Sequence, residues 1–379
     1  MTVQGEQAYE GPGRRIDHDG LLDGRLEKDE RGRWIVTRHA DAVFVATSSD
    51  LFSSAVSRFL QVPNGLDGGA HRAHRALLDS FFSADRMEAL RPVVGRIADD
   101  MVGSVAVGET CDAVSDLGAR FAVRAQSAWL GWPAGLEDDL LSWMQENQSA
   151  SRSGDLTRTA AVAEGFNVII RRLLISRRES PYPPRDVTAE LSGLRGMDGS
   201  PLSEDVIVSV LRNWTGGDLG SIALCVGVVL HWLATHPALQ DELAEAQDSE
   251  VDLAIDEMLR IDDPFVFSRR VATCPVRLGG RSIEPGDKVV INWAAANRDP
   301  RTFGDPDAYH PHRNAEANLV YGIGPHACPG RPLATMELRV LIRAILSRRR
   351  LLLGPHRRPE RARPPLGGFS AVPIVLAEL

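Results

Sequence analysis

The stretch Tyr321-Gly322-Ile323-Gly324-Pro325-His326-Ala327-Cys328-Pro329-Gly330 decides how the rest of the chain is interpreted. It is followed by Arg331-Pro332 and by a run, Leu333 to Arg343, with the spacing of a helix. Glycines at both ends let the loop turn tightly, and the start of a helix favours a thiolate. The pattern indicates a loop that presents one sulfur to a flat cofactor. A buried structural cysteine is the commoner explanation for such a residue taken alone.

Composition describes an ordinary globular chain. Of the 379 residues, 43% are hydrophobic and 25% are charged, and the formal net charge is −8. No repeat or long linker divides the chain, so we expect one large domain over residues 33–379. The negative charge argues against nucleic acid as a partner. Residues 1–32 are expected to be a partly flexible segment without signal peptide or membrane span, which predicts a cytoplasmic protein with no membrane partner.

The four cysteines are Cys111, Cys225, Cys274 and Cys328. They lie far apart, and none shows the CxxC spacing of a zinc site or the pattern of a disulfide framework. Cys328 therefore needs a separate explanation.

Hydrophobic spacing predicts a mainly α protein with a minor β portion. The segments with helical spacing are 84–107, 116–130, 154–178, 203–233 and 251–260. The segments with strand-like alternation are 33–37, 268–278, 281–283, 288–293 and 371–376.

The longest predicted helix has an unusual centre. Ser203 and the acidic residues after it form a helix start, and His236-Pro237 marks the far end. The middle reads Thr215-Gly216-Gly217-Asp218-Leu219-Gly220-Ser221. Each glycine costs about 1 kcal/mol relative to alanine in a helix. We therefore expect another molecule to approach this backbone closely, with a simple kink in the core as the alternative.

The cysteine loop resembles the haem-binding signature of the cytochrome P450 family, an aromatic residue followed by Gly-x-Gly-x-His-x-Cys-x-Gly. Tyr321 stands where phenylalanine is usual, and further matches lie upstream in the family's order from about His71 onward. The resemblance implies a cytochrome P450-like fold and haem b (iron protoporphyrin IX), with Cys328 as the metal ligand. It also implies haem contacts from Tyr321, Gly322 and Gly330.

A second match is the pair Glu257 and Arg260, which lie three residues apart and therefore on one helical face. An arginine holds a carboxylate through two parallel hydrogen bonds. The resemblance implies a buried triad with a later arginine, which falls here on Arg313. We expect these three residues to support the fold around the cysteine loop.

Four cations match the family's contacts to the haem propionates. Arg270 stands at the start of a predicted strand, His71 and Arg75 lie one helical turn apart, and His326 belongs to the cysteine loop. Each of them is an ordinary exposed cation in the alternative interpretation. Their occurrence in the family's order favours the role in haem binding.

The chain departs from the family in the middle of the long helix. Family members normally have an acid followed directly by threonine, which pass protons to the iron-bound oxygen. Counting back from His236-Pro237 without gaps puts Ser221 at the alcohol position and Gly220 at the acid position. Asp218, three residues before Ser221, would supply the missing carboxylate from the same helical face. Alignment on the glycines, with Asp218 as the acid and Leu219 in place of the alcohol, would need a bulge in the helix.

The resemblance predicts a soluble bacterial haem-thiolate monooxygenase that hydroxylates or oxidatively couples a small organic metabolite of secondary metabolism. Dioxygen and electrons from a ferredoxin and a ferredoxin reductase would drive it, with Arg72 and Arg331 as candidate docking residues. The altered helix keeps two alternatives open: a peroxide-dependent peroxygenase, and a haem-thiolate isomerase or dehydratase. The expected pocket residues are Asn213, Trp214, Gly217, Val266, Phe267 and Phe369.

Overall fold

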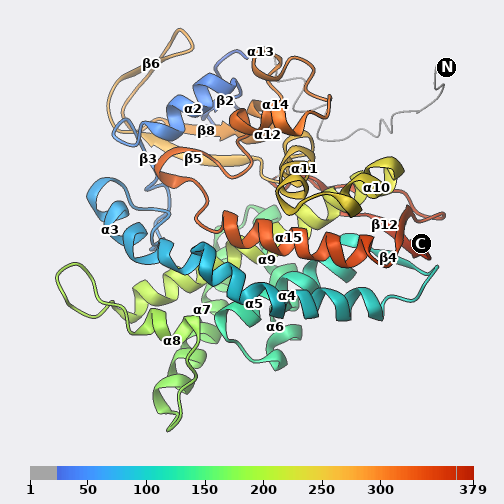
Figure 1. The fold of residues 1–379 in the computed structure, drawn as a ribbon. Helices are drawn as coiled ribbons and strands as arrows, with labels where there is room; N and C mark the ends of the chain where they lie inside the picture. The colour runs from blue at the N-terminus through green and yellow to red at the C-terminus, as the bar shows by residue number, and fades with distance from the viewer. Residues whose placement is uncertain (1–23, 364) are drawn as a thin grey trace.

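The computed structural model describes residues 24–363 and 365–379, so most of the predicted flexible segment lies outside the described residues. Helices dominate and short strands accompany them, as predicted (Figure 1). The main helices are α2 (His39–Thr47), α3 (Gly68–Leu78), α4 (Ala84–Ser104), α5 (Arg120–Leu130), α6 (Glu137–Ser153), α7 (Leu156–Glu179), α8 (Val187–Ser192), α9 (Glu204–Thr235), α10 (Pro237–Glu245), α11 (Asp248–Ile261) and α15 (Arg331–Leu346). Shorter helices are α12 (Trp293–Ala296), α13 (Pro300–Phe303) and α14 (Pro311–Asn314).

The strands form small sheets at the edges of the helical mass (Figure 1). The largest sheet has the order β1-β2-β8-β5-β3 and contains β1 (Glu27–Lys28), β2 (Trp34–Val36), β3 (Phe52–Ser53), β5 (Phe267–Ala272) and β8 (Lys288–Asn292). The other sheets are built from β4 (Thr110–Asp112), β6 (Val276–Leu278), β7 (Arg281–Ile283), β9 (Arg350–Leu353), β10 (Glu360–Arg361), β11 (Phe369–Ala371) and β12 (Pro373–Ala377).

The domain begins before the predicted boundary at residue 33. Strand β1 pairs with β2 in antiparallel register, with Glu27 opposite Ile35. Leu26 is only 4% exposed and belongs to the core beneath this sheet. The boundary is therefore corrected, because the residues just before it already contribute a strand and a buried side chain.

Helix α9 runs through the centre of the molecule and is continuous over its whole length (Figure 1). The Ser203 hydroxyl caps its start by accepting a hydrogen bond from the N–H of Val206, and Pro237 begins the next helix, as the sequence predicts. The helix is apolar and long enough to cross a membrane by composition, yet 61% of its most apolar window is buried inside the fold. It is therefore the core helix of the domain.

The second half of α9 packs closely against a π-helical segment, η2 (Ala113–Ala119). A Cβ added to Gly227 would lie 2.5 Å from Cγ2 of Val114, and one added to Gly118 would lie 2.9 Å from the carbonyl oxygen of Ala223. Glycine is thus needed at both positions because the two backbones approach closely. The helix predicted for residues 116–130 therefore begins at Ala113, and its first part is a π-helix, which is wider than an α-helix.

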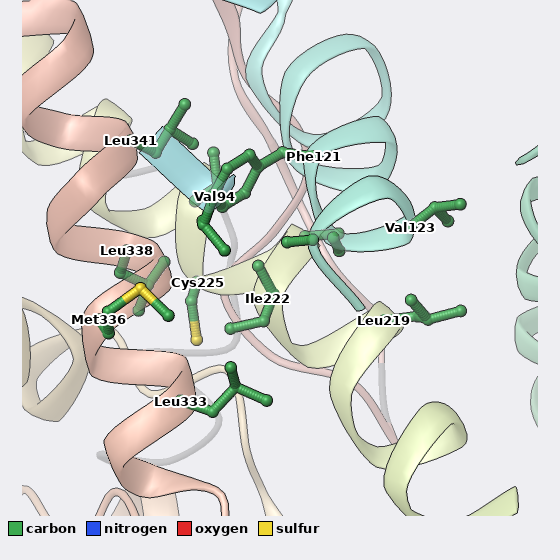
Figure 2. Close-up of a cluster of buried hydrophobic side chains, with 14 of the residues drawn as sticks. Val94, Phe121, Val123, Leu219, Ile222, Cys225, Leu333, Met336, Leu338 and Leu341 are labelled. Carbon is green, nitrogen blue, oxygen red and sulfur yellow. The ribbon is translucent and has the colours of Figure 1, made fainter. Parts of the chain in front are cut away.

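Helix α15, which follows the cysteine loop, covers another side of α9. Figure 2 shows Leu333 and Met336 of α15 beside Ile222 and Cys225 of α9, within one hydrophobic cluster. The α9–α15 seam therefore fixes where the loop before α15 lies relative to the centre of α9.

Candidate active site

The cysteine loop is held in a fixed shape by its own backbone. The N–H of Cys328 donates to the carbonyl of Tyr321 at 2.9 Å, and the N–H of Ala327 donates to that of Gly324 at 3.0 Å. Gly322 and Gly324 have φ angles of 67° and 76°, which side chains strongly disfavour. The predicted role of the glycines in turning the loop is confirmed by this geometry.

Cys328 is an exposed residue of the described structure. Burial is the main cause that raises the pKa of the thiol, while N–H groups of Gly330 and Arg331 act in the opposite direction. A Cβ on Gly330 would lie 3.8 Å from this sulfur and 3.6 Å from the ring of Phe82. A side chain at this position would therefore lie in ordinary van der Waals contact with both groups.

Tyr321 is anchored beside the loop. Its hydroxyl lies 3.4 Å from that of Thr335 at the start of α15, and the guanidinium of Arg331 lies 5.0 Å from its ring centre. Arg331 also donates to Asp256 at 2.8 Å, with its side chain 58% exposed. The tyrosine thus acts as a packing residue that ties the loop to α11 and α15.

The four predicted propionate contacts come together from three parts of the chain. His71, Arg75 and His326 line a cavity of about 340 Å³, and the charge of Arg270 acts on His326. The rings of His71 and His326 lie 4.1 Å apart. Arg75 donates to the carbonyls of Pro325 and Ala327, each at 3.0 Å. We refer to His71, Arg75, Arg270 and His326 as the cation cluster.

The members of the cation cluster differ in their anionic partners. Arg75 pairs with Asp79 at 2.6 Å at the exposed edge of the cluster. Burial lowers the pKa of Arg270, which is only 8% exposed. Burial and the charges of His71 and Arg270 lower the pKa of His326 to about 4. Its Nε2 atom is buried and 3.6 Å from Asp67, beyond hydrogen-bond distance. Arg270 is thus a buried guanidinium without a carboxylate at ion-pair distance among the described residues, which fits a ligand that carries carboxylate groups.

Asp67 is a neighbour of the cation cluster that the sequence analysis did not identify. Its carboxylate accepts hydrogen bonds from the Ser53 hydroxyl at 2.5 Å and from the N–H of Ser54 at 3.0 Å. It therefore orders the chain before α3. Its position one helical turn before His71 was the available signal.

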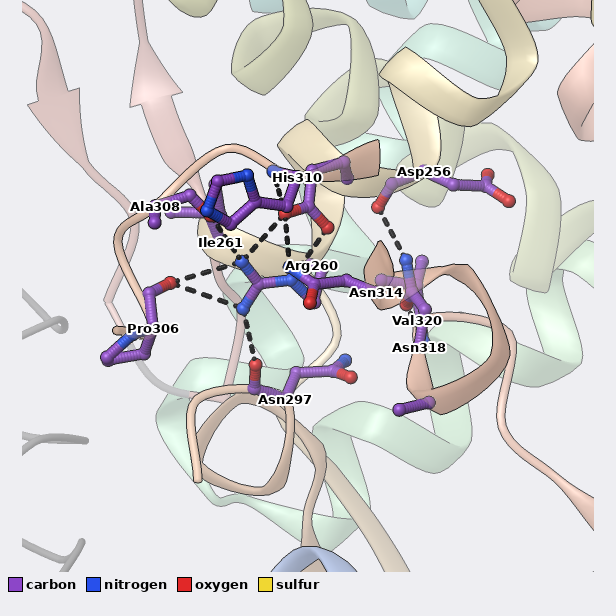
Figure 3. Close-up of polar contacts among 12 residues, drawn as sticks. Asp256, Arg260, Ile261, Asn297, Pro306, Ala308, His310, Asn314, Asn318 and Val320 are labelled. Atoms are coloured by element: carbon purple, nitrogen blue, oxygen red, sulfur yellow. Dashed lines mark hydrogen bonds and ion pairs between the residues drawn. The ribbon is translucent and has the colours of Figure 1, made fainter. Parts of the chain in front are cut away.

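The predicted triad is correct in two of its three members. Arg260 donates two hydrogen bonds to Glu257, at 2.8 and 3.0 Å, and the side chains are 0% and 1% exposed. Figure 3 shows Arg260 within the polar network around it. Arg313 is exposed, and the prediction that it completes the triad is wrong. The next residue, Asn314, donates to Glu257 at 2.7 Å, and the N–H of His310 donates at 2.9 Å. Neutral donors thus satisfy the carboxylate, whose charge Arg260 already neutralises.

Helix α9 is one continuous α-helix at its centre. This agrees with the count back from His236-Pro237 without gaps, which puts Ser221 at the alcohol position and Gly220 at the acid position. A Cβ added to Gly217 or Gly220 would meet no atom within 4 Å among the described residues. Ser221 is half-buried on the same face as Asp218. The Oδ2 atom of Asp218 is buried without a hydrogen-bond partner in residues 24–363 and 365–379, and burial raises the pKa of Asp218 to about 7.

Two of the predicted pocket residues belong to the core. The ring centroid of Trp214 lies 5.1–5.4 Å from those of Phe81, Phe82 and Trp129. Phe369 is 0% exposed, and its ring lies 4.3 Å from that of His231. Their assignment to the pocket wall is corrected, because their rings are taken up by core contacts.

The other predicted pocket residues lie on α9 and at the start of β5. Asn213 donates to the carbonyl of Val62 at 2.9 Å, which ties the loop before α3 to α9. Val266 is 2% exposed and Phe267 is 42% exposed at the start of β5. With Gly217, these residues remain predictions as substrate contacts.

Glu337 on α15 is a further residue that the sequence analysis missed. It is 0% exposed, and neither carboxyl oxygen has a hydrogen-bond partner in the described part of the chain. Burial, assisted by the charge of Asp218, raises its pKa well above the usual range. An acid on the apolar side of the predicted helix 333–343 was the available signal.

Comparison with known proteins identifies the family. Residues 169–374 match the family described as Cytochrome P450. The chain is 30% identical over 331 residues to the Cyclomarin C epoxidase of Salinispora arenicola, covering 83% of each chain. It is 29% identical over 346 residues to the Epothilone C/D epoxidase of Sorangium cellulosum, covering 84% of this chain and 81% of the relative. The chain belongs to the cytochrome P450 family.

A solved structure agrees over nearly the whole fold. A mutant of P450 EryK in complex with erythromycin B superposes with a TM-score of 0.86 at 24% identity, covering 97% of this chain and 98% of that chain. Its membership of the family and the relatives named above make the protein an oxidoreductase of the monooxygenase type with haem b as its cofactor. The exposed Cys328 and the buried guanidinium of Arg270 fit an iron porphyrin with two propionates.

Proposed function

We propose that this protein is a haem-thiolate monooxygenase in which Cys328 is the iron ligand. The observation that carries the proposal is that the exposed Cys328 stands on the same loop as His326, which the charge of the buried Arg270 reaches and beside which Arg75 is bonded to the loop. When bound, the haem supplies oxygen activation, which a thiolate ligand promotes by donating electron density to the iron. The chain itself binds and orients the cofactor and moves protons.

Each part of the site has a separate task in this proposal. Arg75 and Arg270 neutralise the propionates, and the neutral rings of His71 and His326 donate hydrogen bonds to them. The N–H groups at the start of α15 stabilise the thiolate charge of Cys328. Ser221 and Asp218 replace the usual alcohol and acid, because Gly220 carries no side chain. Asp218 exchanges its proton near neutral pH, since burial raises its pKa to about 7.

The substrate we propose is a small organic metabolite of secondary metabolism, which is hydroxylated or oxidatively coupled. The names of the relatives cited above, a cyclomarin C epoxidase and an epothilone C/D epoxidase, support this class. Gly217 and Gly220 leave space on α9 for a bulky group, and Asn213, Val266 and Phe267 are the proposed contacts beside it.

We propose a ferredoxin and its reductase as electron donors, acting in the cytoplasm. Arg72 is exposed next to the cation cluster, where an acidic protein would be attracted. Arg331 keeps much of its side chain exposed, although Asp256 already engages it. Of the two docking candidates, Arg72 therefore offers the freer positive charge.

A reconstituted assay tests the proposed function. The haem-loaded protein is incubated with candidate macrocyclic and aromatic metabolites, NADPH, a surrogate ferredoxin and a ferredoxin reductase under isotopically labelled dioxygen. The expected product of a hydroxylation carries one labelled oxygen atom and forms only with the redox partners. Turnover with hydrogen peroxide alone would favour the peroxygenase alternative, which the glycine at the acid position specifically supports.

A further inference from the structure

Two fully buried polar side chains, Gln126 on α5 and Thr215 on α9, have no hydrogen-bond partner among the described residues. Both are 0% exposed, and the unpaired atoms are both ends of the Gln126 amide and the hydroxyl oxygen of Thr215. The indole Nε1 of Trp129, one helical turn after Gln126, is a third such group. Buried polar groups are nearly always paired, so these three residues need an explanation.

Another buried glutamine shows how the fold pairs such a side chain elsewhere. Gln240 is 1% exposed. Its amide donates to the carbonyls of Leu233 and Leu351, at 2.8 and 2.9 Å, and accepts from the N–H of Leu351 at 3.0 Å. Gln126 is at least as deeply buried and makes none of these bonds to the protein.

Thr215 and Trp129 also differ from their counterparts. Thr235, on the same helix as Thr215, donates to the carbonyl four residues earlier at 2.9 Å, which is the usual bond of a threonine inside a helix. Trp132 donates its indole N–H to the hydroxyl of Thr188 at 2.9 Å. All three unpaired groups therefore lack the local partner that would satisfy them.

The segment formed by η2 and α5 runs antiparallel to α9. Gly118 lies opposite Ala223, because a Cβ added to the glycine would lie 2.9 Å from the Ala223 carbonyl oxygen. Farther along α5, the ring centroids of Trp129 and Trp214 lie 5.1 Å apart. The residue numbers thus rise along α5 as they fall along α9.

This register places Gln126 opposite Thr215. Gln126 follows Gly118 by eight residues, and Thr215 precedes Ala223 by eight, a spacing that stays on one face of a helix. The helix backbones touch at Gly118, whereas two indole rings stand between them at Trp129. The space between the helices therefore widens where the unpaired groups lie.

We infer that α5 and α9 enclose an internal water-binding site formed by Gln126, Thr215 and Trp129. A water molecule has two hydrogens and two lone pairs, so it can accept from the amide of Gln126 and from the indole and donate to Thr215. Buried waters make about three hydrogen bonds of this kind. The three side chains are neutral, which favours water over an ion as the ligand.

The site joins α5 to the part of α9 that carries proposed substrate contacts. Asn213 and Gly217 lie two residues before and two residues after Thr215. Gln126 and Thr215 do not bond to each other directly, so a shared water would hold the two helices together at this point. This role concerns the packing of the fold and does not depend on the reaction at the haem.

A high-resolution crystal structure of the haem-loaded protein tests the site. We expect an ordered water at about 2.7–3.2 Å from side-chain atoms of both Gln126 and Thr215. A crystal structure of Thr215→Val should lack this water or show it displaced. Absence of the water from the parent protein, whether or not Gln126 and Thr215 then bond directly, would overturn the inference.

A double-mutant cycle tests whether the two residues share the water in solution. Gln126→Met and Thr215→Val keep the approximate shape of each side chain and remove its hydrogen-bonding atoms. We expect each change to lower the midpoint of thermal unfolding of the haem-loaded protein by about 1–3 °C, and the double variant to lose less than the sum.

Thr235→Val supplies the matched control for this cycle, because its hydroxyl bonds within its own helix. Combined with Gln126→Met, it should give additive losses. Additive losses for Gln126→Met with Thr215→Val as well, or a gain in stability in Gln126→Met, would contradict a shared water.

Discussion

Glu257 on α11 and Glu337 on α15 are both buried glutamates in the core, but their surroundings are opposite. Glu257 receives hydrogen bonds from Arg260, from the backbone of His310 and from Asn314. Glu337 receives none within the described residues. A buried acid with a full set of donors holds a charge and fixes the fold, whereas one without donors keeps its proton. The first region is scaffold, and the second is suited to proton chemistry.

The largest expected effect comes from breaking the satisfied network. Glu257→Ala leaves the fully buried Arg260 without its carboxylate. Removal of one partner of a buried ion pair costs about 3–5 kcal/mol in the free energy of unfolding. Urea unfolding followed by tryptophan fluorescence measures this loss. Arg313→Ala is the matched control and should change stability by less than about 0.5 kcal/mol, because Arg313 is exposed.

A second change tests the cation cluster. Arg270→Ala removes a buried guanidinium, and a hydrogen bond to a charged group contributes about 1.5–3 kcal/mol. We expect haem to transfer to a scavenger protein about 10- to 100-fold faster from this variant. Arg269→Ala, on the same strand but exposed, should release haem at the parent rate. Equal rates for all three proteins would remove Arg270 from the proposed haem contacts.

The third expected effect is a pH dependence that arises from Asp218. Its folded-state pKa of about 7 lies above the ordinary value of 3.8, so the folded protein binds the extra proton. This contribution to stability is complete below about pH 4 and is lost as the pH rises through about 7, with a slope of at most about 1.4 kcal/mol per pH unit.

Asp218→Asn should flatten this part of the stability profile. Unfolding of the haem-loaded protein at several pH values measures the difference between parent and variant. Asp205→Asn, at the exposed start of the same helix, should retain the parent's profile. A profile that does not change in Asp218→Asn would contradict the assignment of a buried, protonated aspartate.

The smallest expected effect concerns the glycines of α9. A Cβ at Gly217 meets no neighbour within 4 Å in the described structure, so Gly217→Ala should stabilise the helix by about 0.5–1 kcal/mol. Gly227→Ala should destabilise the protein instead, because its Cβ would lie 2.5 Å from Val114. Thermal unfolding of both variants distinguishes open space from close packing along one helix.

Most of the fold was predictable because helix and strand periods are local properties of the chain. The predicted ends of α9 and the strand pair around Gly279-Gly280 agree with the structure. The start of the domain was misplaced because a two-residue strand such as β1 carries almost no periodic signal.

Site residues could be predicted where the chemistry allows only a few residue types. Apolar residues of the pocket could not be predicted in this way. The cysteine loop and the cation cluster need specific groups, so motifs predict their members, and the structure brings those residues together. Trp214 and Phe369 were misassigned because an apolar side chain is equally suited to a core and to a pocket wall. Glu337 was missed because only the packing of α15 against α9 shows that its carboxyl group has no partner.

The reduced carbon monoxide spectrum tests the central claim most directly. The purified haem-loaded protein and a Cys328→Ser variant are reduced with dithionite and exposed to carbon monoxide. The account predicts a strongly red-shifted Soret band in the parent that is absent from the variant. The same band in both proteins, or its absence from the parent, would contradict the assignment of Cys328 as the thiolate ligand.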